Sequence, residues 1–148
     1  MASSEPTTAE ASTHRTLLFR AGDRTFGCGI DAVREIIPQR RATRLPGAPP
    51  AVQGLINLRG TIVTVVDLAL WLGSERPAGT DGSIVLVDHG ARVAGIAVDQ
   101  VLDVQVVAQE EAAGTIGDRS GAVRGMGRLG DTVVILLDVT SLIKQTLV

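Results

Sequence analysis

The chain has 148 residues and a formal net charge of -2 at pH 7, and 45% of its residues are hydrophobic. This composition is typical of one globular domain and not of a disordered chain. Because the net charge is slightly negative, we expect no nucleic acid partner and no attraction to anionic membranes. The single cysteine, Cys28, excludes an internal disulfide and a cysteine-based zinc site, which favours a reducing compartment.

Two further features of the sequence concern its location. The N-terminal segment MASSEPTTAEASTH contains acidic residues and lacks the basic start and apolar core of a signal peptide. No apolar run approaches the roughly 18 residues of a membrane span. We therefore expect a cytoplasmic protein without direct membrane insertion, with a disordered tail over residues 1–14 and one domain over residues 15–148.

The first half of the domain predicts short strands joined by turns. Runs of β-branched residues bounded by Gly, Asp and Pro indicate strands, and an aspartate before an apolar segment can cap a helix. In chain order we expect strands over 16–19 and 25–30, a short helix over 31–37 that Pro38 ends, an extended and solvated connection over 39–50, a strand over 61–66 that follows a turn at Arg59 and Gly60, and a helix from Asp67 to Gly73.

The second half continues in the same way. Its apolar runs alternate with turns rich in Gly and Asp, and only the C-terminus has the spacing of an apolar helix face. We expect a polar loop over 74–82, a hairpin of 83–87 and 92–98, a strand over 99–107, a polar and acidic turn region over 109–121, a hairpin of 122–126 and 132–137, and a final helix capped by Asp138 or Thr140.

These elements predict an all-β fold with short helices. Eight to ten short strands at regular spacing are typical of a barrel or sandwich, and the strand and helix alternation of a parallel sheet is missing. Hairpins spread along the whole chain favour two small barrels. Since only 2% of the residues are aromatic, the core must consist of Val, Ile, Leu and Ala.

One segment matches a cofactor motif literally. Residues 125–130 read GMGRLG, which fits the G-x-G-x-x-G pattern of dinucleotide-binding proteins. That motif binds a pyrophosphate at the N-terminus of a helix, whereas Asp131 and a β-rich run follow here. We therefore predict that these glycines let the backbone turn, and a nucleotide-binding protein remains only a remote alternative.

The other candidates for chemistry are isolated in the sequence. His14 and His89 have no serine in a nucleophile-elbow context, and Cys28 reads as a small buried residue. Asp99 and Asp103 would share one strand face without a third ligand nearby. We predict no catalytic, cofactor or metal site.

Arg59 is the most unusual residue of the chain. It stands on a tight turn between two segments that must be buried, with Leu58 before it. It is either a solvent-facing turn residue or an exposed recognition arginine, because arginine beside apolar surface is enriched at interfaces. Val33 and Glu35 are either a core residue and a solvated charge, or part of a partner surface.

Several stretches resemble one known family, the CheW family of chemotaxis coupling proteins. The resemblance covers about residues 17–143, in the order of the family. The matching stretches are LLF at 17–19, GD at 22–23, GID at 29–31 with VREI at 33–36, GLINLRGTIV at 54–63 with VDL at 66–68, GIAVD at 95–99, GMG at 125–127, LGD at 129–131 and VILLD at 134–138.

This resemblance implies a fold, a function and a site. It implies two intertwined, five-stranded Src-homology-3-like barrels that share a hydrophobic core, with no catalysis and no cofactor. Members are adaptors that bind the cytoplasmic tips of methyl-accepting chemoreceptors and the regulatory domain of the CheA-type histidine kinase. By motif position, the residues at or near the receptor groove would be Val33, Glu35, Asn57, Leu58, Arg59 and Gly60.

The resemblance leaves some points open. Kinase contacts would come from apolar barrel edges that the motifs do not assign to residues. Val33, Ile36 and Leu58 could act as apolar anchors for a receptor helix, with Arg59 and Glu35 as polar orienters. Thr64 stands where the family often has proline. An adaptor of a non-flagellar pathway such as pilus motility is the alternative, because the pathway lies in the partners and not in the fold.

Overall fold

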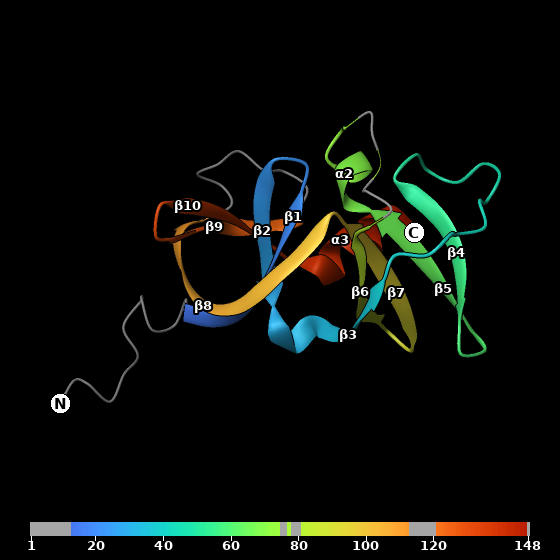
Figure 1. Cartoon of the computed structure of the whole chain (residues 1–148), viewed down its shortest axis with the longest axis horizontal. Helices are drawn as coiled ribbons and strands as arrows, with labels where there is room; N and C mark the ends of the chain where they lie inside the picture. The colour runs from blue at the N-terminus through green and yellow to red at the C-terminus, as the bar shows by residue number, and fades with distance from the viewer. Residues whose placement is uncertain (1–12, 75–76, 78–80, 113–120, 148) are drawn as a thin grey trace.

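The computed structural model describes residues 13–74, 77, 81–112 and 121–147, and it consists of two lobes that lie side by side (Figure 1). The first lobe contains β1 (Thr13–Ala21), β2 (Arg24–Gly29), β8 (Gln100–Ala112), β9 (Val123–Leu129) and β10 (Thr132–Leu137). They form a closed barrel in the order β1-β2-β10-β9-β8. Its strands pair in antiparallel fashion except β10 and β2, which are parallel.

The second lobe is built from the middle of the chain. It contains β3 (Val33–Pro38), β4 (Val52–Leu58), β5 (Thr61–Asp67), β6 (Ser83–His89) and β7 (Arg92–Val98), in the sheet order β3-β6-β7-β5-β4. The chain therefore leaves the first lobe after β2 and returns to it at β8. This topology confirms the predicted fold class, with the two five-stranded lobes intertwined.

The two edge strands of the second sheet, β3 and β4, are not neighbours in its hydrogen-bonded order. The gap between these two edge strands is here called the seam, and the connection from β3 to β4 lies along it. In this connection the Thr43 N–H donates to the Leu55 carbonyl at 2.7 Å, and the Leu55 N–H donates to the Thr43 carbonyl at 2.8 Å. Gly54 permits this approach, since it has a φ of 142° and a Cβ atom there would collide with the Thr43 carbonyl. The predicted extended connection is confirmed, and its middle lies along the edge of β4.

One apolar cluster joins the two lobes. It combines Phe19 and Phe26 of the first lobe with Val85 and Ile96 of the second, all of them almost completely buried. Each lobe also has its own interior cluster. On β6 both faces are buried, as its continuous apolar run predicts, because Val85 and Val87 face the shared cluster while Ile84 and Leu86 face the second lobe.

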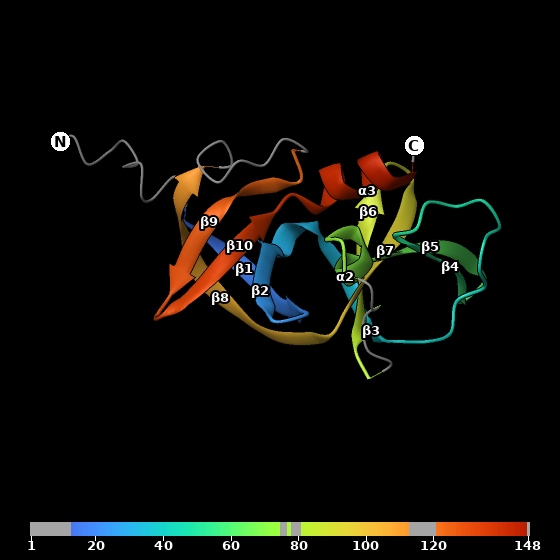
Figure 2. The same ribbon diagram turned by 90° about the horizontal axis from the view of Figure 1, so that it is seen from above.

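The helices are short, and two of them begin where the sequence predicts. The Asp67 carboxylate accepts a hydrogen bond from the Leu70 N–H at 3.1 Å and caps α2 (Leu68–Trp71). Asp138, and not Thr140, caps α3 (Val139–Leu147), since its carboxylate accepts from the Ser141 N–H at 3.0 Å. Figure 2 shows α3 lying over the junction of the lobes. Within the described ranges, no helix is both long and apolar enough to cross a membrane.

The predicted helix over residues 31–37 is wrong. Only a single 3₁₀ turn, η2 (Ile30–Ala32), forms there, and residues 33–38 are strand β3, paired antiparallel with β6. The spacing of Val33, Ile36 and Ile37 fits one helix face, but all three residues are β-branched. Pairing with β6 provides hydrogen-bond partners for the backbone N–H and C=O groups of this segment. The tertiary context therefore overrides the helical spacing.

Two predicted boundaries also move. β1 begins at Thr13, so the last two residues of the predicted tail belong to a strand, and residues 1–12 lie outside the described residues. β8 continues to Ala112, so the start of the predicted turn region over 109–121 is strand, and residues 113–120 lie outside the described residues. The hairpin contacts of β8 with β9 explain the extension, because Gln109 pairs with Gly127.

The interior of the first barrel provides a stability test. Leu136 is 7% exposed and packs with Leu18, Val107 and Val134. We expect Leu136→Ala to lower the free energy of unfolding by about 2–5 kcal/mol, because the substitution leaves a cavity. Urea denaturation measures this change. Val133→Ala on the same strand is the control, since Val133 is 46% exposed; equal effects of the two substitutions would contradict the packing described.

Candidate functional site

The turn between β4 and β5 positions the most unusual residue of the chain. Leu58 and Thr61 pair across it, so Arg59 and Gly60 form a two-residue hairpin loop. Both have positive φ, 51° at Arg59 and 87° at Gly60, as a type I′ turn requires. The Asn57 side-chain oxygen accepts a hydrogen bond from the Gly60 N–H at 2.9 Å, which holds the loop. Arg59 is the only residue other than glycine with positive φ in the part of the chain that the structure describes.

Glu35 holds the guanidinium of Arg59. Arg59 Nη2 donates to Glu35 Oε1 at 2.6 Å, and Nη1 donates to Oε2 at 3.3 Å, which is a bidentate pair. The two residues come from β3 and from the β4–β5 turn, so the pair spans the seam of the second sheet. The side chains are 68% exposed for Arg59 and 37% for Glu35, and a partner can reach both.

The ion pair changes the acidity of Glu35. The hydrogen bond from Arg59 lowers the pKa of the Glu35 carboxyl, the positive charges of Arg59 and Arg34 lower it further, and partial burial opposes them. Glu35 is therefore ionised at neutral pH. Since its pKa is lower in the folded protein than in the unfolded one, any stabilisation from this carboxylate is present above the unfolded pKa and is lost as the pH falls through the folded pKa.

A shallow cavity of about 220 Å³ lies under the ion pair. Its rim is polar and its floor consists of aliphatic side chains of the second-lobe interior. The lining residues are Arg34, Glu35, Leu58, Arg59, Thr61, Val63, Leu86 and Val93. A charged rim around an apolar floor suits a protein partner that inserts an aliphatic side chain.

The structure brings together Glu35, Asn57, Leu58, Arg59 and Gly60 and separates Val33 from them. A β-bulge between Val33 and Glu35 shifts the register with β6, so that Val33 pairs with Val87 and Glu35 pairs with Leu86. Because Val87 and Leu86 face opposite sides of the sheet, Val33 and Glu35 do too.

The three predicted apolar anchors do not form one surface. Leu58 is 8% exposed and belongs to the second-lobe interior, whereas Val33 is half-buried against the shared cluster. Ile36 is 40% exposed. Ile62, which follows the Arg59 turn on β5, is 59% exposed and was not among the predicted site residues. Its exposure depends on which face of β5 points inward, and the sequence does not specify that face.

The GMGRLG segment does not meet the requirements of a dinucleotide site. It runs along β9 into the turn before β10, and no helix begins there. Gly127 lies so close to β8 that a Cβ atom would collide with the Ala108 carbonyl, and Gly130 has a φ of 61°. The prediction that these glycines let the backbone turn is confirmed for Gly130, whereas Gly127 permits the close approach of β8.

The remaining sequence candidates are structural. Cys28 is 2% exposed, and burial raises the pKa of its thiol to about 12, so it is a buried apolar residue as predicted. His89 lies at the end of β6. Among the described residues, no group of three or more His, Cys, Asp or Glu side chains is placed to hold a metal ion.

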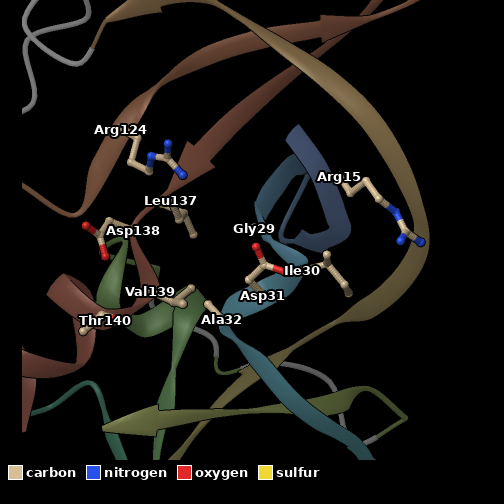
Figure 3. Close-up of a pocket in the computed structure, with 10 residues that line it drawn as sticks. All are labelled: Arg15, Gly29, Ile30, Asp31, Ala32, Arg124, Leu137, Asp138, Val139 and Thr140. Carbon is tan, nitrogen blue, oxygen red and sulfur yellow. The ribbon is translucent and has the colours of Figure 1, made fainter. Parts of the chain in front are cut away.

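A larger hollow, which was not predicted from the sequence, is lined by residues of the first lobe, η2 and the start of α3 (Figure 3). It has a volume of about 550 Å³ and a mixed lining of two arginines, two aspartates and aliphatic residues. The lining residues are Arg15, Gly29, Ile30, Asp31, Ala32, Arg124, Leu137, Asp138, Val139 and Thr140. One of its carboxylates, Asp138, already caps α3. The residues come from β1, β2, η2, β9, β10 and α3, and no local pattern indicates that these elements meet.

The comparison with protein families identifies this architecture. The profile of the CheW-like domain matches residues 15–147. The chain belongs to the CheW-like domain family. The motif stretches that resemble this family, including GLINLRGTIV at 54–63, lie within the match and form β4, the Arg59 turn and β5.

Individual CheW-like proteins support the assignment. The chain is 32% identical over 136 residues to the chemotaxis protein CheW of Klebsiella aerogenes, covering 87% of this chain and 81% of that protein. It is 35% identical over 88 residues to protein PilI of Pseudomonas aeruginosa, covering 59% of this chain and 49% of PilI. The crystal structure of the scaffolding protein TtCheW from Thermoanaerobacter tengcongensis superimposes with a TM-score of 0.75 at 26% identity, covering 84% of this chain and 88% of TtCheW.

A titration of Glu35 tests the ion pair. We expect the carboxyl carbon of Glu35, followed by NMR as the pH falls, to titrate at a lower midpoint than an ordinary glutamate, because Arg59 stabilises the charged form. In Arg59→Gln the midpoint should rise toward the ordinary value. A midpoint that Arg59→Gln leaves unchanged would show that the pair does not form in solution.

Proposed function

We propose that this chain is a non-catalytic adaptor of a bacterial chemosensory array. In this role it binds the cytoplasmic tips of methyl-accepting chemoreceptors and the regulatory domain of a CheA-type histidine kinase, so that the receptors control the kinase. The proposal places the protein in the cytoplasm, where it is recruited to membrane receptors and carries no cofactor of its own.

Three observations support this role. The chain belongs to the CheW-like family, it is similar to proteins named for chemotaxis, and a similar solved protein is described as a scaffold. The observation that carries the proposal is the Arg59–Glu35 pair, a bidentate and exposed pair of opposite charges beside a cavity with a charged rim and aliphatic floor. Such a surface suits recognition of another protein better than it suits chemistry on a small molecule.

The receptor tip is a helical hairpin, and the proposed site fits one in a specific way. A helix docks by placing aliphatic anchors into a groove while polar residues at the rim set its orientation. Arg59 retains donor capacity after it binds Glu35, because a guanidinium has five N–H groups and two of them are used. Asn57 and Gly60 act indirectly by holding the turn, and Ile62 adds exposed apolar surface beside it.

Arg59→Glu tests the site. We expect it to weaken binding to a purified receptor tip by about 30-fold or more, because loss of a hot-spot residue, a class enriched in arginine, costs about 2 kcal/mol or more. It should leave the fold intact, because Arg59 is an exposed turn residue. Calorimetry with the receptor tip and with the kinase regulatory domain measures both affinities, and circular dichroism with urea denaturation monitors folding.

A matched control is available on the first lobe. Arg128 on β9 is 56% exposed and forms an exposed ion pair with Glu110 at 3.6 Å, so Arg128→Glu makes the same change of charge away from the proposed site. We expect Arg128→Glu to bind the receptor tip like the wild type. An unchanged tip affinity in Arg59→Glu would remove Arg59 from the receptor site, and failure of the wild type to bind either partner would overturn the adaptor role.

A second pathway is favoured by one observation. The similarity to protein PilI makes a chemosensory system other than flagellar chemotaxis the second candidate. Deletion of the gene in its own organism distinguishes the two, because loss of swimming chemotaxis indicates a flagellar pathway and loss of surface motility with normal swimming indicates a pilus pathway. We expect Arg59→Glu to fail to complement in either case, because the proposal assigns receptor binding to the same surface for both pathways.

A further inference from the structure

Three exposed arginines lie along the seam of the second lobe. Arg40, Arg41 and Arg44, here called the arginine edge, belong to the connection that runs from β3 toward β4 (Figure 2). All three are exposed, as are Leu45 and Thr43 beside them. This concentration of positive charge is unusual in a chain whose net charge is -2.

The backbone of the arginine edge is anchored at both ends. The Gln39 N–H donates to the Gly82 carbonyl at 3.0 Å, and Thr43 exchanges two hydrogen bonds with Leu55 at 2.7 and 2.8 Å. Gly54 lets this segment lie against β4. The arginines are therefore presented on a fixed scaffold, which lowers the entropy cost of binding a partner.

The arginine edge adjoins the proposed receptor site. Arg40 Nη1 donates to the Asn57 carbonyl at 3.1 Å, and Asn57 holds the turn that carries Arg59. A partner seated on Arg59 can therefore extend along the edge.

The positive charge of the edge is not neutralised within the described residues. None of its three arginines forms a salt bridge there, and the carboxylates of Glu35 and Asp88 are engaged by Arg59 and Arg34. One acidic residue, Asp81, precedes Gly82 at the start of the edge. Three guanidinium groups thus exceed the local negative charge, which favours an acidic partner.

We propose that the arginine edge docks an acidic helical surface of a protein partner. In an extended chain, Arg40 and Arg44 are separated by about 13 Å, which equals a little more than two turns of an α-helix. A helix that carries carboxylates about two turns apart therefore matches the edge. This inference rests on the proposed function and deepens it, because it assigns an acidic flank to the receptor helix that contacts Arg59.

A protein partner fits the edge better than a nucleic acid or a membrane does. The chain has two Phe, one Trp and no Tyr, and both Phe side chains are buried in the shared cluster, so no aromatic platform for bases accompanies the arginines. Basic clusters that bind anionic lipids typically contain about four to eight Lys or Arg residues, and the edge has three.

The test compares two triple variants of equal net charge. In the edge variant, Arg40, Arg41 and Arg44 are replaced by Gln; in the control, the exposed Arg20, Arg24 and Lys144 are replaced by Gln. Stopped-flow kinetics measure binding to a purified receptor tip at several salt concentrations. In parallel, each variant is titrated with a synthetic amphipathic helix that carries Glu residues seven positions apart on one face, and with anionic vesicles and duplex DNA.

We expect the edge variant alone to bind the receptor tip about 10 to 100 times more weakly, mainly through a slower association rate and with a weaker dependence on salt. The affinity for the acidic helix should fall by a similar factor in the edge variant and stay unchanged in the control.

Each other outcome has a definite meaning. Equal association rates and salt dependence in the two triple variants would overturn the edge while leaving the adaptor role intact. Failure of the wild type to bind the receptor tip would overturn the proposed function. The titrations of the two triple variants with the acidic helix would then test the arginine edge independently. If the wild type binds vesicles or DNA but not the acidic helix, and the edge variant loses that binding, the partner of the edge is a lipid surface or a nucleic acid. This result would overturn the inference.

Discussion

The structure depends on the apolar cluster that the two lobes share. The first barrel closes only when β1 and β2 meet β8 to β10, which follow the whole second lobe in the sequence. Phe19, Phe26, Val85 and Ile96 pack in one cluster, so each lobe supplies part of the interior of the other. Asp99 strengthens the return to the first lobe, since its carboxylate accepts from the Gly22 N–H at 2.6 Å and its N–H donates to the Arg20 carbonyl at 2.9 Å.

The candidate site is a consequence of how the second sheet ends. Its edge strands β3 and β4 are not paired with each other in the sheet order, and backbone hydrogen bonds of Thr43 with Leu55 join the connection after β3 to β4. Side-chain contacts provide the other links across this seam. Arg59 binds Glu35 at the turn, and Arg40 donates to the Asn57 carbonyl. An exposed ion pair contributes little to stability, which agrees with the recognition role proposed for the exposed charges at this seam.

The relation between sequence and structure differs from element to element. The hairpins, the Asp67 cap and the left-handed Gly73 follow local rules and were predictable. Residues 31–37 fit a helix by spacing, yet they form a strand because β6 offers a backbone partner. Arg59 was recognisable as unusual because a charged residue stood on a buried hairpin. The resemblance placed Glu35 in the same site, but its ion pair with Arg59 could not be predicted, since the two residues are separated by 24 positions and meet only through the sheet order.

The sequence by itself determined the local elements of this protein, the all-β class and, through the motifs around Arg59, the family. These features depend on backbone preferences, turn residues and apolar periodicity, which act over a few residues. Only the tertiary structure decided the strand character of β3, the opposite faces of Val33 and Glu35, the burial of Leu58 and the arginine edge beside Arg59. Each of these depends on which distant strands pair and in what register, and a one-residue bulge suffices to move a side chain from one face of a sheet to the other.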